Sequence, residues 1–271
     1  MITPNLRSWR GAVVAWVLTA CTPMPPNVDT REFVPLTLAP ASLTGVRDRR
    51  GEFRQLFCHE ENADGEALED ACDSALRHFR GETPATHLPV VRKDLRSHYR
   101  VALAMGMGWD CMRDLIDESH LPITSLREFG FDTLLLEVEG LSGSERNADL
   151  IAEALRAATS GEDQRPFILV GYSKGAPDIL VALQQFPDLL THTAAFVSLA
   201  GAVGGSPIVR HTSDMTMAAL RNSPYGDCSN GDGSVLESLQ PKRRHAWLAD
   251  YLPLSIPTYS VVTAPEPERV S

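Results

Sequence analysis

The stretch "FILVGYSKGAPDIL", residues 167–180, decides the fold that this sequence predicts. Its apolar beginning has the length and composition of a buried strand. After Lys174, apolar residues such as Ile179 and Leu180 recur at helical spacing. Two glycines and a serine, in the order Gly-Tyr-Ser-Lys-Gly, lie between the two segments. The stretch therefore predicts a strand, a tight turn and a helix, with Ser173 on the turn.

The turn itself fits the pattern G-x-S-x-G, in which the serine is a candidate nucleophile. Such a serine must occupy a tight, strained turn at the carboxyl end of a strand, so that its hydroxyl is accessible. Gly171 and Gly175 flank Ser173 and leave room for the strand and the helix to approach each other. The alternative is a glycine-rich turn without chemistry. We expect Ser173 to be a catalytic nucleophile, because a strand and a helix frame the turn.

Strands and helices alternate on both sides of this turn. Such alternation predicts a parallel sheet with right-handed crossovers. Residues 201–250 break the alternation with Gly, Pro and Ser, and predict an insertion that acts as a lid. The expected strands are residues 100–104, 132–138, 166–170, 193–200 and 256–263, and the expected helices are residues 121–129, 144–159 and 174–187.

With these features, residues 97–271 resemble the α/β-hydrolase family. A second match is "MGMGW", residues 105–109, which follows a strand where the family usually has a His-Gly-type loop. The resemblance implies an α/β fold, a mostly parallel sheet flanked by helices. It also implies an oxyanion hole formed by the backbone N–H groups of Met107 and Lys174. Met105 stands where histidine is common, but the backbone role does not need that side chain. The alternative for "MGMG" is a flexible turn.

A serine nucleophile needs a base, and the family's order along the chain is serine, acid, histidine. The resemblance places the acid at Glu266, with Glu268 as a weaker candidate. The alternative is a solvated glutamate in the proline-rich "APEPE" turn. No histidine follows Glu266 in the sequence. We therefore expect a hydrolase domain that is incomplete at its C-terminal end.

Three histidines follow Ser173, and each has a non-catalytic interpretation. His192 is expected directly before a strand, at the edge of the sheet opposite Ser173. His211 falls in the expected lid, and His245 falls on an expected surface helix.

Residues 1–20 have the pattern of an export signal. Two arginines precede the apolar residues 11–20, which are fewer than the about 20 needed to span a bilayer. The end of this segment, "LTAC", resembles the lipobox of bacterial lipoproteins, and the resemblance implies lipidation of Cys21. The alternative is a plain secretory signal. Thr22 is not the aspartate that retains many such proteins at the inner membrane, so we expect an outer-membrane location in the cell envelope.

The segments after the signal are expected to lead into the hydrolase domain. Residues 21–45 are rich in proline, which predicts a tether without a packed core. Residues 46–96 contain apolar residues in partly helical spacing and predict a helical preface.

Four further cysteines are candidates for disulfides, because exported chains meet oxidising conditions. Cys58 and Cys72 are close in the sequence and are the expected local pair. Cys111 and Cys228 then pair by elimination. The alternative is that two or more of these cysteines are free buried thiols.

The composition of the chain argues against some classes of binding partner. The formal net charge of −10 gives no reason to expect nucleic acid, which favours basic surfaces. No C-x-x-C pair occurs, and the acidic loop at residues 227–234 does not fit the calcium-loop template, so neither a metal nor a cofactor is expected. The expected function is a lipid-anchored serine hydrolase of small-molecule acyl substrates such as esters, thioesters or lactones. One alternative is that the chain as written is inactive, because no catalytic histidine follows Glu266. The other alternative is a non-catalytic lipoprotein that binds a partner or lipid through the hydrolase scaffold.

Overall fold

The structure is a computed structural model, and the chain divides into two units, Asn27–Lys93 and the remainder. It describes residues 45–63, 76, 82, 84–85, 94–117, 121–251 and 253–262, with the side chains of residues 59–63 excepted. In the part of the chain that is described, no helix combines the length and the apolar character that crossing a membrane requires.

The smaller unit contains helix α3 (Arg50–Ala63). Arg54, on this helix, donates a hydrogen bond through Nε to Glu82 Oε1 over 2.8 Å, and both side chains are largely buried. Cys58, on the same helix, is disulfide-bonded. Its expected partner, Cys72, lies outside the described residues. A helix is therefore confirmed at the start of the expected preface.

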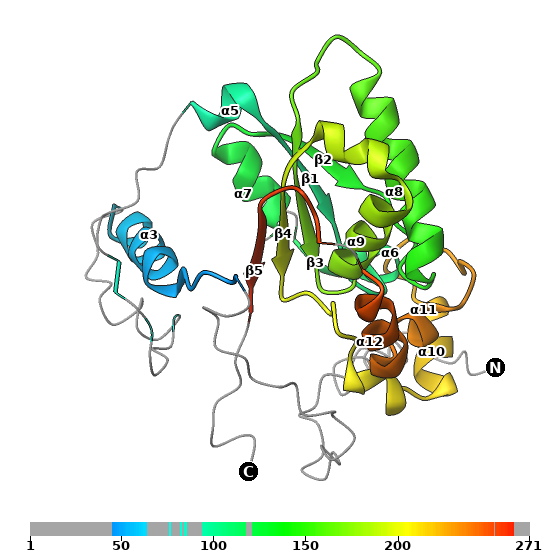
Figure 1. The fold of residues 1–271 in the computed structure, drawn as a ribbon. Helices are drawn as coiled ribbons and strands as arrows, with labels where there is room; N and C mark the ends of the chain where they lie inside the picture. Colours follow the sequence, from blue (N-terminus) through cyan, green and yellow to red (C-terminus); the bar gives the residue numbers. More distant parts are fainter. Residues whose placement is uncertain are drawn as a thin grey trace, which may run out of the picture. The chain divides into compact units, whose positions relative to one another are not determined.

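The larger unit is built on a five-stranded parallel sheet in the order β2-β1-β3-β4-β5 (Figure 1). Each strand expected from the sequence is confirmed, with ends that differ by at most two residues. The strands are β1 (Arg100–Ala104), β2 (Asp132–Leu136), β3 (Phe167–Tyr172), β4 (Thr193–Leu199) and β5 (Thr258–Val261).

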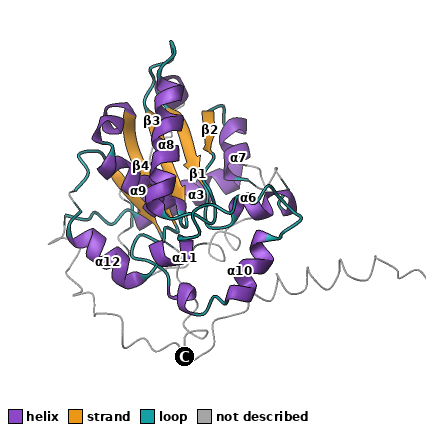
Figure 2. Ribbon diagram, turned by 90° about the vertical axis from the view of Figure 1, so that its right-hand side faces the viewer, coloured by secondary structure: helices purple, strands orange, loops and turns teal. Residues whose placement is uncertain are grey.

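Helices cover both faces of this sheet, because neighbouring residues of a strand point to opposite faces. Ala102 and Ala104 belong to a core shared with α8 and α9, whereas Leu103 and Met105 pack with Ile123 of α7. Figures 1 and 2 show α8 and α9 on one side of the sheet and α7 on the other. The helices of the larger unit before the insertion are α5 (Leu95–His98), α6 (Trp109–Met112), α7 (Pro122–Glu128), α8 (Ser144–Thr159) and α9 (Gly175–Gln185), with short 3-10 turns at η2 (Arg113–Leu115) and η4 (Pro187–His192).

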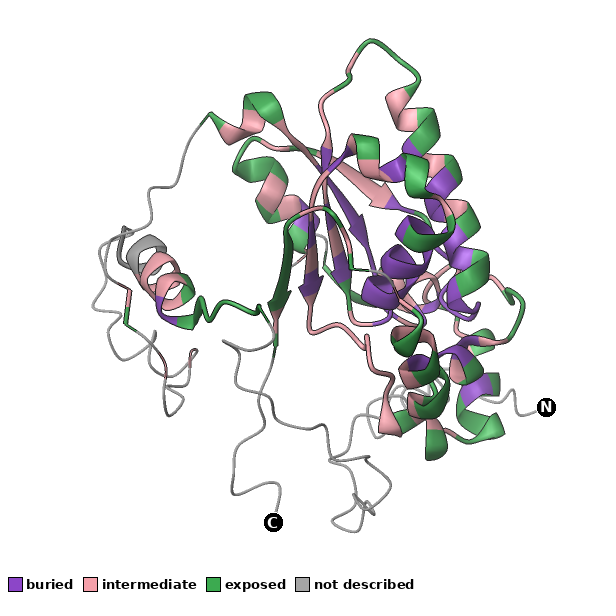
Figure 3. Ribbon diagram, viewed as in Figure 1, coloured by how far each residue is buried: buried purple, intermediate pink, exposed green. Residues whose placement is uncertain are grey.

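The core of the larger unit is buried between the sheet and helices α8 and α9. Figure 3 shows buried segments along the inner strands and along the sides of both helices that face them. Phe167, Leu169 and Phe196 from the strands and Ile151 and Ile179 from the helices are almost completely buried. The apolar residues whose spacing predicts these elements are therefore the residues that fill the core.

Residues 201–250 form a compact insertion at the carboxyl ends of the strands (Figures 1 and 2). A second apolar core holds it together, in which Met217, Val235 and Leu239 pack against Cys111 and Leu141. The structure joins Cys111 to Cys228, the pair expected by elimination, and so ties the insertion to α6. The insertion contains η5 (Pro207–Arg210), α10 (Asp214–Arg221), α11 (Val235–Ser238) and α12 (Pro241–Ala249). Its role as a lid stays a prediction.

Candidate functional site

Ser173 lies on a strained turn between β3 and α9. Its φ is 52°, and Ala200 is the other described non-glycine residue with a positive φ. Such a conformation costs about 1–3 kcal/mol and persists when its surroundings enforce it. Here the Ser173 N–H donates to Leu199 O over 3.0 Å, and Ser173 O accepts from the N–H groups of Ala176 and Ala202 over 3.3 and 3.0 Å. The turn is therefore held by backbone hydrogen bonds on both sides of the serine.

The two glycines beside Ser173 are required by close backbone contacts. A Cβ atom on Gly171 would lie 2.4 Å from Ala176 Cα, and one on Gly175 would lie 2.2 Å from Ala104 O. Gly106, in the loop after β1, is also tight, since a Cβ there would lie 3.0 Å from Ser173 Cβ and 3.3 Å from Ser173 Oγ. The loop containing "MGMG" therefore lies directly against Ser173.

Two backbone N–H groups near this serine have no acceptor in the part of the chain that is described. Among the described residues, no group accepts a hydrogen bond from the N–H of Met107 or of Lys174. The loop that carries Met107 is anchored one residue later, where Gly108, with a φ of 70°, donates to Gly140 O over 3.0 Å. One of these N–H groups directly follows Ser173 in the chain, and the other belongs to the loop that lies against it.

The side chain of Lys174 is directed into the interior. Lys174 Nζ lies 2.6 Å from Asp178 Oδ2 and 2.9 Å from Asp178 Oδ1, and both side chains are 1% exposed. Asp178 Oδ2 also accepts from Asn147 Nδ2 over 2.7 Å. The backbone of Lys174 thus lies at the site, whereas its ammonium group is paired with Asp178 in the interior. Sequence reasoning missed this pair, although its spacing of four residues on a helix brings the two side chains together.

The loop between β2 and α8 forms hydrogen bonds with Asn147 of α8 and with Asp110 of α6. Asn147 accepts from Glu139 N over 3.0 Å and donates to Glu139 O over 3.1 Å. Asp110 Oδ1 accepts from Gly140 N over 3.1 Å, and Asp110 Oδ2 accepts from Ser229 N of the insertion over 3.2 Å. No sequence motif pointed to Asp110 or Asn147, because their partners lie far away along the chain.

Glu139 carries the clearest pKa shift in this loop. A hydrogen bond from the Arg146 guanidinium, at 3.1 Å, lowers the pKa of the Glu139 carboxyl, and a hydrogen bond from the Ser142 hydroxyl acts in the same direction. Burial raises the pKa of this carboxyl, but by less than the hydrogen bonds lower it. The carboxylate is therefore favoured, and it stabilises the loop in its charged form.

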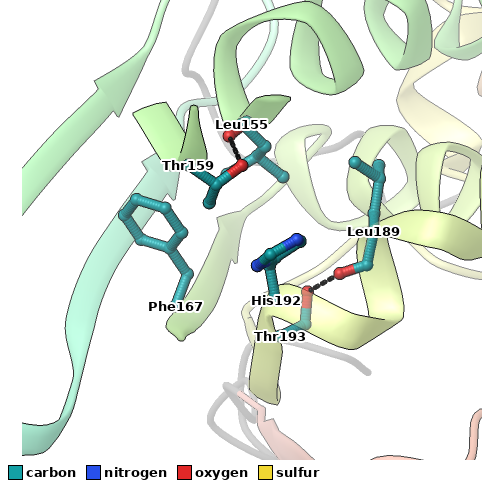
Figure 4. Close-up of a pocket in the computed structure, with 6 residues that line it drawn as sticks. All are labelled: Leu155, Thr159, Phe167, Leu189, His192 and Thr193. Atoms are coloured by element: carbon teal, nitrogen blue, oxygen red, sulfur yellow. Dashed lines mark hydrogen bonds between the residues drawn. The ribbon is translucent and has the colours of Figure 1, made fainter. Parts of the chain in front are cut away.

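The candidate histidines do not contact Ser173 Oγ, which has no hydrogen-bond partner among the described residues. His192 lies in η4 directly before β4, at the edge of the sheet opposite Ser173, as expected. There it lines a small pocket with Leu155, Thr159, Phe167, Leu189 and Thr193 (Figure 4). His211 is exposed.

His245 lies on α12, most of whose residues are exposed or partly exposed. Its side chain is partly buried, and its Nε2 would lie 3.5 Å from a Cβ atom on Gly204. The preceding residue of the helix is directed into the interior. Arg244 is buried, donates to Val203 O over 3.0 Å and stacks on the Trp247 ring, and its burial lowers its pKa.

The other candidates from the sequence are three residues that the structure does not describe and one acidic loop. Glu266, Glu268 and Cys21 lie outside the described residues. The acidic loop at residues 227–234 is used for internal contacts, because Asp232 Oδ1 accepts from Gly143 N over 3.0 Å at the start of α8. In the described ranges, no group of three or more His, Cys, Asp or Glu side chains could hold a metal ion.

Comparison with known proteins finds similar solved structures. No family model and no curated protein matches the chain. The crystal structure of the metagenomic carboxyl esterase MGS0156 is 30% identical, with a TM-score of 0.69, over 92% of this chain and 72% of that one. The mature Bacillus licheniformis lipase BlEst2 is 17% identical, with a TM-score of 0.48, over 64% and 68% of the two chains. The phospholipase PlaB from Legionella pneumophila is 17% identical, with a TM-score of 0.45, over 60% and 38%.

Proposed function

Because the chain belongs to the α/β-hydrolase family, we propose that it is a serine hydrolase of carboxylic ester substrates, with Ser173 as its nucleophile. The observation that carries the proposal is the turn at Ser173, with its φ of 52°, together with the N–H groups of Met107 and Lys174, for which no described residue supplies an acceptor. The metagenomic carboxyl esterase, at 30% identity, supports an ester as the substrate.

The proposed reaction transfers an acyl group from an alcohol to water. Ser173 Oγ attacks the carbonyl carbon, and the oxygen that becomes negative accepts hydrogen bonds from Met107 N–H and Lys174 N–H. Loss of one such donor typically costs about 2.7–4 kcal/mol of transition-state stabilisation. A general base must accept the Ser173 proton and return it to the leaving alcohol. In the family's order this base is a histidine that follows the acid, and no residue of this sequence after Glu266, the proposed acid, is a histidine. Water then cleaves the acyl-serine ester and restores Ser173.

We propose that the insertion provides the binding surface for the acyl group. A small apolar pocket lies between Met112 and Leu115 on one side and Leu220 and Tyr225 of the insertion on the other. Leu220 also touches the loop that carries Met107, since a Cβ atom on Gly108 would lie 2.9 Å from Leu220 Cδ2. This small pocket therefore lies next to the loop that carries one of the proposed oxyanion donors.

The direct test is hydrolysis of a p-nitrophenyl ester by the full chain and by its Ser173→Ala variant. Turnover by the wild type is expected to fall by more than about a thousandfold in the variant, because the attacking oxygen is lost. Circular dichroism checks that both proteins are folded. Equal turnover by the two proteins would refute Ser173 as the nucleophile. A folded wild type without any Ser173-dependent turnover would favour the non-catalytic binding scaffold.

We also propose that the chain is a lipoprotein of the cell envelope, anchored in the outer membrane through Cys21. The support is the lipobox-like "LTAC" at residues 18–21. Mass spectrometry of the mature protein from a bacterial membrane fraction is expected to find acyl chains on an N-terminal Cys21. The Cys21→Ser variant is expected to leave the membrane fraction. An unmodified Cys21 in the mature wild type would contradict the proposal.

A further inference from the structure

The two proposed oxyanion donors come from different segments, and both must reach the same substrate oxygen. Donors of this kind act at about 2.7–3.1 Å, and a misplacement of 1 Å can cost about a hundredfold in rate. The contacts that set the spacing between Met107 N–H and Lys174 N–H therefore matter for the rate. Each donor is anchored by a separate series of hydrogen bonds.

The first series holds the loop of Met107. Gly108 N–H donates to Gly140 O, and Gly140 N–H donates back to Asp110 Oδ1, which also accepts from Cys111 N over 3.1 Å. The fit is tight, because a Cβ atom on Gly140 would lie 2.2 Å from Asp110 Oδ1 and 2.6 Å from Gly108 N. Asp110 therefore fastens the loop of Met107 to Gly140.

The second series holds Lys174. Its ammonium is paired with Asp178, Asp178 accepts from Asn147, and Asn147 exchanges two hydrogen bonds with the backbone of Glu139. Lys174, Asp178 and Asn147 are almost completely buried. Hydrogen bonds in such an environment are strong, and an unpaired member is costly, so this series has little freedom to move.

Both series end on adjacent residues of one loop. We infer that the Glu139–Gly140 segment sets the distance between the two oxyanion donors, and that Asp110 and Asn147 are positioning residues for ester hydrolysis. Neither side chain needs to contact the substrate. The inference rests on the proposed function, since it concerns the transition state of that reaction.

This arrangement predicts a particular kinetic effect. The oxyanion exists in the transition state and not in the bound ester, so a wrong spacing lowers kcat and leaves KM almost unchanged. Asp110→Ala and Asn147→Ala are each expected to lower kcat by about 10- to 100-fold. Because both act on the same distance, the loss in the double variant is expected to be clearly smaller than the product of the two single losses.

The experiment measures kcat, KM and the melting temperature of the full chain with a p-nitrophenyl ester. Asp110→Asn is the conservative variant, because it keeps an acceptor for Gly140 N–H, and it is expected to retain most of the kcat that Asp110→Ala loses. Gly140→Ala changes the same segment directly, by adding a Cβ atom against Asp110 and Gly108, and is also expected to lower kcat. Thr193→Val is the matched control, since it removes a buried hydrogen bond of 2.8 Å to Leu189 O at the opposite edge of the sheet. It is expected to lower the melting temperature without changing kcat.

The outcomes separate this inference from the proposed function. Ser173-dependent turnover that is unchanged in folded Asp110→Ala and Asn147→Ala would overturn the positioning role and leave the nucleophile in place. A rise in KM at constant kcat, or losses in the double variant that multiply, would also overturn it. Absence of Ser173-dependent turnover in the wild type would overturn both proposals. Should either alanine variant fail to fold, Gly140→Ala and Asp110→Asn carry the test.

Discussion

The two edges of the parallel sheet are built differently, and the difference locates the site. At the carboxyl edge, buried charges, a positive φ at Ser173 and a disulfide hold several loops in one arrangement. At the amino edge, charged side chains form exposed pairs such as Arg156 with Asp188, at 2.9 Å. Exposed pairs add little to stability, whereas strain and buried charge are costly. A fold retains strain and buried charge where the positions of particular atoms must be fixed, and in this protein these features lie at the carboxyl edge.

The largest difference between the edges is expected for their ion pairs. Lys174→Met leaves the buried carboxylate of Asp178 without its cation and is expected to lower the free energy of unfolding by about 3–5 kcal/mol. Arg156→Met is the matched change at the amino edge, and its exposed pair is expected to contribute hardly at all. Urea unfolding of both variants makes the comparison. Similar losses for the two variants would contradict the distinction between the edges.

A smaller difference is expected for glycines. Gly175→Ala places a Cβ atom 2.2 Å from Ala104 O and is expected to destabilise the protein by about 1–3 kcal/mol. Gly161→Ala, in the connection to β3 at the amino edge, meets nothing within 4 Å and is expected to be neutral. Thermal unfolding followed by circular dichroism measures both. If Gly175→Ala were as stable as the wild type, the tight turn around Ser173 would be wrong.

The pH dependence of stability gives a still smaller effect at the carboxyl edge. The Arg146 guanidinium lowers the pKa of Glu139 below its ordinary value of 4.5, so the folded state favours the carboxylate. The stability that this group contributes is complete above pH 4.5 and is lost as the pH falls through the lowered pKa. Glu139→Gln is therefore expected to lose less stability than the wild type between pH 6 and about pH 3. Urea midpoints across that range measure it, and equal slopes for both proteins would count against the Glu139 contact.

The smallest effect is expected for the histidine at the amino edge. His192 lines a pocket together with Phe167 and Thr193, the first residues of β3 and β4 (Figure 4). Ser173 follows the opposite end of β3. His192→Gln is expected to leave kcat and KM for a p-nitrophenyl ester unchanged. A large fall in kcat in the folded variant would show that the amino edge takes part in the reaction.

The elements of the fold could be predicted because their signals are local. The four apolar residues of β3 and the helical spacing of α8 each determine their element within a few residues, and the glycines around Ser173 mark the turn. The Cys111–Cys228 disulfide followed from counting cysteines. The contacts of Asp110 with Ser229 and of Asn147 with Asp178 could not be predicted, because they depend on how distant segments pack. The roles of Glu266 and Cys21 stay predictions.

The central claim is that Ser173, on the turn between β3 and α9, is the nucleophile. The most direct measurement treats the folded full chain with a fluorophosphonate ester and locates the adduct by peptide mass spectrometry. We predict one adduct, on the peptide that contains Ser173, and none in the Ser173→Ala variant. A folded protein that forms no adduct, or that carries it on another residue, would contradict the account.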